Sequence, residues 1–176
     1  LNVLNARKWT REFDWGELGQ LLIANGYDFD LINDDALQHR AQIVNGQIHV
    51  GSLQYKILIL PNIQALPLET LQFIQQYVRQ GGVVIALERV PDSSTGLADY
   101  AQKDRQVRAM VQEMFDQPVG DDGTAPKQYG KGRTYHIKRV INRQDILDRR
   151  SSSLDPFVNT LRNHLQPDFS IDFALQ

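Results

Sequence analysis

The chain has 176 residues, a length that suits a single domain spanning residues 1–176 and burying roughly 70% of the surface exposed by its unfolded form. A net charge of −2 gives no electrostatic reason to expect nucleic acid or an anionic membrane as a partner, and no apolar run approaches the roughly 20 residues that cross a bilayer. The absence of cysteine excludes disulfides, thiol nucleophiles and cysteine-bound metals, but leaves the compartment open.

The two ends of the chain resemble boundaries within a longer protein. Leu1 is preceded by no initiator Met, and no signal-peptide pattern follows it. The last residues come just after an apolar alternation. We therefore expect a fragment of a larger multidomain protein.

The first part of the chain carries signals for two helices, a strand and a hairpin. Apolar residues recur at helical spacing between a good N-cap, Asp14, and a good C-cap, Asn25-Gly26. Asn45-Gly46 stands between two alternating runs, which is the strongest short-range hairpin signal. In chain order these patterns predict a helix over 14–25, a strand over 27–32, a short helix over 36–39 and a hairpin over 42–50.

Residues 55–91 read as one βαβ unit of a parallel sheet. KILIL at 56–60 and VVIAL at 83–87 are runs of mostly branched apolar residues, as expected for strands covered on both faces. An amphipathic helix is predicted over 67–80, and Gly81-Gly82 ends it. A crossover of this length joins parallel strands with a right-handed connection.

The remaining elements complete the predicted fold. A loop follows Pro91, and Asp155-Pro156 opens the last helix. We expect an α/β fold: a flavodoxin-like three-layer α/β/α sandwich whose mainly parallel sheet uses strands near Tyr27, Lys56, Val83 and Arg133. The patterns after the loop predict a helix over 104–115, a mobile loop over 116–132, a strand over 133–140, a helix from 155 and a closing strand over 169–173.

The βαβ stretch also carries a family resemblance. YKILILPNIQALPLETLQFIQQYVRQGGVVIAL, preceded by GYDFDLINDDAL and followed by YGKGR at 129–133, resembles the glutamine-amidotransferase-like domain of modular glycoside hydrolases. Relatives of that domain include the trimerisation domain of bacterial β-galactosidases, and the greatest likeness is to the corresponding domain of bacterial α-L-rhamnosidases. The resemblance implies a class I glutamine-amidotransferase-like fold and an accessory role beside a catalytic barrel.

The resemblance also implies partners and a place of action. The partners are other domains of the same polypeptide, or a second copy in a homo-oligomer. The parent enzyme is expected to release L-rhamnose or a related sugar from plant polysaccharide, which implies a periplasmic or secreted protein. We expect no cofactor.

The residues after the second buried strand argue against catalysis through a nucleophile. Glu88, Arg89, Val90 and Pro91 stand where a catalytic member of the fold places its reactive residue. An amidotransferase needs a cysteine there, and the chain has neither cysteine nor a G-x-S-x-G elbow. We therefore assign no catalytic residue.

Charged residues near the strand ends give the candidate binding residues Asp34, Glu88 and Arg89. Glycoside hydrolysis needs two carboxylates about 5–9 Å apart, and ligands of open α/β sheets bind at the carboxyl ends of strands. Asp34 and Glu88 therefore allow a stand-alone hydrolase as an alternative. We favour the interpretation that Asp34 and Asp35 cap the short helix and that Glu88 pairs with Arg89.

The histidines, glycines and aromatic residues form further patterns that bear on ligand binding. The four histidines show no metal-ligand spacing, and Gly130 to Arg133 opens a strand rather than the helix of a phosphate loop, so these glycines indicate a tight turn. No dinucleotide-binding fingerprint follows a strand. A free-standing sugar or small-molecule binding module that uses the strand ends and the loop over 116–132 is the other alternative. Exposed aromatic rings can also stack on sugars, and the candidate rings are Trp9, Phe13, Trp15 and Tyr27, although helical spacing assigns Trp15 to the core face.

Overall fold

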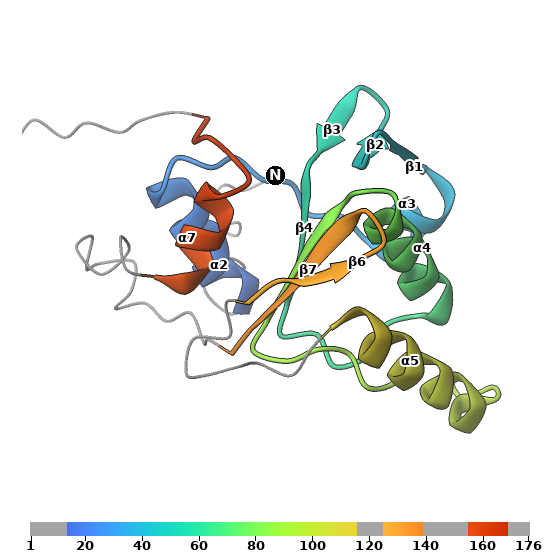
Figure 1. Ribbon diagram of the computed structural model, residues 1–176. Helices are drawn as coiled ribbons and strands as arrows, with labels where there is room; N and C mark the ends of the chain where they lie inside the picture. The colour runs from blue at the N-terminus through green and yellow to red at the C-terminus, as the bar shows by residue number, and fades with distance from the viewer. Residues whose placement is uncertain (1–13, 116–124, 139–154, 169–176) are drawn as a thin grey trace, which may run out of the picture. The chain divides into compact units, whose positions relative to one another are not determined.

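The computed structural model describes residues 14–115, 125–138 and 155–168 (Figure 1). The chain divides into two compact units, one of residues 1–31 and 140–176 and the other of residues 32–139. The single domain over residues 1–176 stays a prediction. Among the described residues, no helix is both long and apolar enough to cross a membrane.

The first unit contains helices α2 (Asp14–Ala24) and α7 (Pro156–Arg162). The chain reverses after α2 at Gly26, whose φ of 82° suits glycine. The Asp155 carboxylate caps α7 by accepting hydrogen bonds from the backbone N–H groups of the second and third residues after it. The predicted helix after Asp155-Pro156 is therefore confirmed.

The second unit contains a three-stranded antiparallel sheet. Its strands are β1 (Ala41–Val44), β2 (Gln47–Val50) and β3 (Leu53–Tyr55). Asn45 and Gly46 both have positive φ, 52° and 74°, as a two-residue hairpin turn requires. The predicted hairpin is confirmed, and β3 was not anticipated.

A second sheet follows, with the strand order β4-β5-β7-β6. The parallel pairing of β4 with β5, joined through helix α4, confirms the predicted βαβ unit. Strand β7 pairs with β5 in parallel and with β6 in antiparallel orientation. The bounds are β4 (Ile57–Pro61), α4 (Leu68–Arg79), β5 (Val83–Leu87), β6 (Lys127–Tyr129) and β7 (Gly132–Ile137).

Three helices of this unit lie on one side of the second sheet: α3 (Asp34–His39), α4 and α5 (Tyr100–Met114) (Figure 1). The apolar stripe of α4 packs on every second residue of β4 and β5, as the alternation of side chains in a strand dictates. The buried residues of this core include Leu58, Leu60, Leu71, Ile74, Tyr77, Val78, Val84, Ala86, Val107, Val111 and Met114.

The predicted flavodoxin-like three-layer sandwich with a mainly parallel sheet is wrong. Of the five strand pairings in the described residues, three are antiparallel and two are parallel. The antiparallel pairings form a separate sheet and add β6 to the edge of the second sheet. The chain is therefore a mixed α/β protein. The predicted class I glutamine-amidotransferase-like fold is overturned by the same strand pairings.

Several predicted boundaries also change. Residues 27–32 form no strand, and the helix predicted from 104 begins at Tyr100. Strand β6 lies inside the stretch predicted as a mobile loop over 116–132, of which residues 116–124 lie outside the described residues. The strand predicted over 169–173 lies outside them as well.

Candidate functional site

The carboxyl ends of the three parallel strands bring Asn62, Glu88 and His136 to one edge of the second sheet. Asn62 directly follows β4, Glu88 directly follows β5, and His136 is the last residue but one of β7. The backbone N–H of Asn62 donates to the Leu87 carbonyl at 3.0 Å, and the N–H of Glu88 donates to the Ile137 carbonyl at 2.9 Å. The three strand ends are thus held side by side. We call this group of Asn62, Glu88 and His136 the polar edge.

Glu88 occupies a strained turn. Its φ is 67°, and the N–H of Arg89 donates to the carbonyl of Leu87 at 2.8 Å, which closes a three-residue γ-turn around Glu88. A γ-turn with positive φ at its central residue is the rare and strained form. Strained backbone of this kind costs about 1–3 kcal/mol, and it clusters at functional sites. The position that the sequence indicated for a nucleophile therefore has unusual geometry, although it holds a glutamate.

Asn62 and His136 each keep one buried polar atom without a hydrogen-bond partner in the described structure, Oδ1 and Nδ1 respectively. The other ring nitrogen of His136, Nε2, lies 3.3 Å from the backbone oxygen of Glu88. A carbonyl oxygen only accepts, so Nε2 carries the hydrogen in neutral imidazole and Nδ1 is an acceptor. Both unpartnered atoms of the polar edge are therefore acceptors.

The sequence missed Asn62 and His136 as candidate site residues. The spacing of the histidines gave no signal for His136, whose strand β7 lies between β5 and β6 and whose Nδ1 is buried. The signal was present in Asn62, a polar residue that directly follows a buried run and tolerates positive φ.

Asp34 has a structural contact at the start of α3. Its Oδ1 accepts a hydrogen bond of 2.8 Å from the hydroxyl of Thr70, which is buried on α4. The Thr70 hydroxyl in turn accepts from the side-chain amide of Gln38 at 2.8 Å. This chain of bonds joins α3 to α4.

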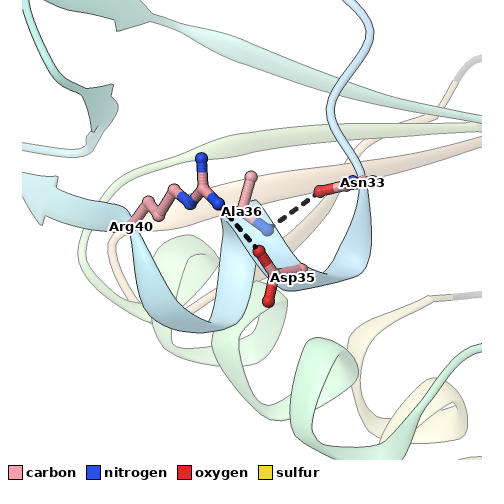
Figure 2. Close-up of polar contacts among 4 residues, drawn as sticks. All are labelled: Asn33, Asp35, Ala36 and Arg40. Carbon is pink, nitrogen blue, oxygen red and sulfur yellow. Dashed lines mark hydrogen bonds and ion pairs between the residues drawn. The ribbon is translucent and has the colours of Figure 1, made fainter.

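The cap of α3 is Asn33, one residue before the predicted cap. Its Oδ1 accepts from the backbone N–H of Ala36 at 2.9 Å (Figure 2). Asp35 forms an exposed ion pair with Arg40 at 3.4 Å, also drawn in Figure 2. Asp34 and Asp35, which were predicted as caps, therefore lie in the first turn of α3. Their negative charges still interact favourably there with the positive end of the helix dipole.

Arg89 is exposed and points to a neighbouring loop. Its Nη1 lies 3.5 Å from Oε1 of Gln64, and no ion pair joins it to Glu88 among the described residues. In the same residues, no hydrogen bond or ion pair joins Asp34 to Glu88 or Arg89. Glu88 and Arg89 therefore share one turn, whereas Asp34, the third predicted residue, bonds to Thr70 instead.

The other candidate features take structural roles. Gly130, with φ of 61°, and Lys131 form the tight turn between β6 and β7, which confirms the interpretation of these glycines. Tyr27 is only 2% exposed and offers no stacking platform. Trp9 and Phe13 lie outside the described residues. The residues that the structure describes contain no cluster of three or more His, Asp or Glu suited to a metal ion.

Comparison with known proteins identifies a family. The sequence pattern of the glycoside hydrolase 106 family, described as alpha-L-rhamnosidase, matches residues 18–158. The searches of curated proteins and of solved structures found no match. The matched segment includes the βαβ unit, the polar edge and the turn at Gly130. The chain therefore belongs to the alpha-L-rhamnosidase family of glycoside hydrolases.

Proposed function

We propose that this chain is a non-catalytic accessory domain of an α-L-rhamnosidase and that it packs against another domain of the enzyme or against a second copy. The stand-alone hydrolase alternative requires two acids, one of which is Asp34. The observation that carries the proposal is that Asp34 is already engaged in a structural hydrogen bond. Its carboxylate is bonded to the buried Thr70 hydroxyl and links two helices. A carboxylate held in this way suits a structural role better than general acid–base chemistry.

Exposed apolar side chains support the packing role. Leu97, in the connection before α5, and Tyr100, the first residue of α5, are 92% and 60% exposed, and Leu53 on β3 is 52% exposed. Single exposed apolar residues are ordinary on a protein surface. Leu97 and Tyr100 lie only three residues apart in the sequence, so together they can offer an apolar contact to a neighbouring domain.

The catalytic alternative is tested by assaying the 176-residue chain on aryl α-L-rhamnosides and aryl β-galactosides. We expect no turnover above that of buffer. Turnover that is lost in Glu88→Gln and retained in Glu69→Gln would overturn the proposal. Glu69 is the matched control because it is an exposed glutamate in the first turn of α4 and is not a member of the polar edge.

The packing role is tested by hydrogen exchange of the chain alone and within its full-length enzyme. We expect slower exchange around Leu97 and Tyr100 in the full-length enzyme. Equal exchange throughout the second unit in the two samples, together with a monomeric chain in solution, would contradict the accessory role.

A further inference from the structure

Charge is unevenly distributed over the second unit. None of the described strands, β1 to β7, contains an aspartate or a glutamate. The acidic residues described in this unit lie on its helices or in the connection between β5 and α5: Asp34, Asp35, Glu69, Glu88, Asp92, Asp99, Asp104 and Glu113. Positive charge gathers instead at the amino ends of the parallel strands.

Four exposed cations lie at these amino ends: Lys56, Arg79, Lys131 and Arg133. We call them the basic patch. Lys56 directly precedes β4, and Arg79 is the last residue of α4, which leads into β5. Lys131 lies in the turn between β6 and β7, and the strand register places Arg133 opposite Val83, the first residue of β5. The patch therefore draws on three neighbouring strands.

Backbone contacts fix the positions of these cations. The N–H of Lys131 donates to the carbonyl of Arg79, and the N–H of Arg133 donates to the carbonyl of Gly82, both at 3.1 Å. The guanidinium of Arg79 donates from Nε and Nη2 to the hydroxyl of Tyr129, at 3.1 and 2.7 Å. Side chains that are already held in place lose less conformational entropy when a partner binds.

No acidic side chain of the described residues forms an ion pair with the basic patch. Glu113 joins the network only through Tyr129, whose hydroxyl donates to its Oε2 at 3.2 Å. Like charges held at one end of a sheet repel each other, and opposite charges brought against them relieve that repulsion. The patch is thus complementary to a negatively charged surface.

We propose that the basic patch docks an acidic face of another domain of the full-length enzyme. This proposal rests on the accessory role proposed above and adds the chemistry of the partner. Guanidinium and ammonium groups pair with carboxylates. Lys56 and Arg133 lie on either side of β5, two strand spacings or about 10 Å apart, so one small anion is too short to bridge them. A polypeptide surface that carries several Asp or Glu residues spans this distance.

A second copy of the chain is a poor partner for the basic patch. In a two-fold dimer the same surface of each copy meets its equivalent. Four cations would then face four cations, and like charges across an interface oppose association. Charge complementarity therefore favours a different, acidic domain.

The test compares hydrogen exchange at residues 79–82 and 130–133 in the chain alone and in the full-length enzyme. We expect exchange about tenfold slower in the full-length enzyme, as four exposed ion pairs together would give. Salt near 1 M, where the Debye length is about 3 Å, should remove most of this difference. The double variant Lys56→Glu, Lys131→Glu should remove it as well. Both side chains are exposed and make no hydrogen bond to the described residues, so the variant should fold.

The matched control is Lys103→Glu, Arg105→Glu, which changes the charge equally on α5 and should leave the protection unchanged. The docking proposal is overturned if exchange at 79–82 and 130–133 is equal in the two samples, or if the protection survives charge reversal. It is also overturned if the chain alone gains this protection as its concentration rises, because the occupant is then a second copy. Slower exchange at these residues when alginate, a carboxylated polysaccharide, is added to the full-length enzyme would show an uncovered patch and overturn it too. Protection around Leu97 and Tyr100 without protection of the basic patch would refute the docking surface and leave the accessory role standing.

Discussion

The hydroxyl of Tyr77 on α4 donates a hydrogen bond of 2.7 Å to the backbone carbonyl of Lys56, the residue just before β4. The Tyr77 side chain is fully buried, and its ring lies against Gly82, where an added Cβ would come within 2.3 Å of the ring. One aromatic side chain of α4 thus contacts the residues just before both β4 and β5.

The Tyr77 contact predicts a loss of stability in alkaline solution. Burial raises the pKa of Tyr77 to about 12 from its ordinary value of 10.0. Above pH 10 the unfolded chain therefore loses this proton first, so the free energy of unfolding falls as the pH rises from 10 to 12, by about 2–3 kcal/mol in total. Urea denaturation at a series of pH values measures the fall.

The variant Tyr77→Phe isolates this effect. It should lose about 1 kcal/mol of stability near neutral pH, because the bond to Lys56 is lost, and its stability should fall less steeply between pH 10 and 12. Tyr100→Phe is the control, because the Tyr100 side chain is 60% exposed. A Tyr77→Phe curve that keeps the full slope would contradict the prediction.

Gly132 should tolerate no side chain. An added Cβ would lie 2.2 Å from the backbone oxygens of Gly82 and Val78, neither of which is a flexible side-chain end. We expect Gly132→Ala to lower the free energy of unfolding by about 3 kcal/mol or more. The control is Gly96→Ala, where nothing lies within 4 Å and only the φ of 90° opposes alanine, at about 1–2 kcal/mol. Thermal unfolding of the two variants distinguishes a steric role from general sensitivity to glycine loss.

The turn at Glu88 should become more stable with glycine. Glu88→Gly removes the cost of positive φ and should raise the free energy of unfolding by up to about 1 kcal/mol. Glu88→Ala removes the carboxylate but keeps the strain, so it should show no gain. If both variants are destabilised equally, the carboxylate rather than the backbone decides the stability of this turn.

The bond between Asp34 and Thr70 should couple α3 to α4. A double-mutant cycle of Asp34→Ala and Thr70→Val should give a coupling energy of about 1 kcal/mol, because the bond is partly buried. Asp35→Ala is the control. Its ion pair with Arg40 joins side chains that are 60% and 73% exposed, so its loss should cost less than about 0.5 kcal/mol. A coupling energy near zero would show that the Asp34 carboxylate does not join the two helices.

The sequence predicted those elements whose signals are local. The βαβ unit from 56 to 87 carries two buried runs, an amphipathic helix and a double glycine, and the hairpin carries Asn45-Gly46. Each of these was confirmed, because hydrophobic periodicity and turn chemistry are read within a few residues.

The fold class was missed because sheet membership depends on tertiary contacts. Strands β3 and β6 have three residues each, too few for an alternation to show, and the alternating residues 27–32 form no strand. For the same reason, only Glu88 of the polar edge was predicted as a candidate site residue. Glu88 follows a recognisable strand, whereas the proximity of Asn62 and His136 to it arises only from strand order.

The connections after β4 and β5 are bonded to each other. The N–H of Asp92 donates to the Gln64 carbonyl at 3.0 Å, and the N–H of Leu66 donates to the Ser93 carbonyl at 3.1 Å. A residue inserted into either connection would therefore shift the register of the other. Anyone who transplants one of these segments between relatives must exchange both together, since the hydrogen bonds make the pair a single unit of structure.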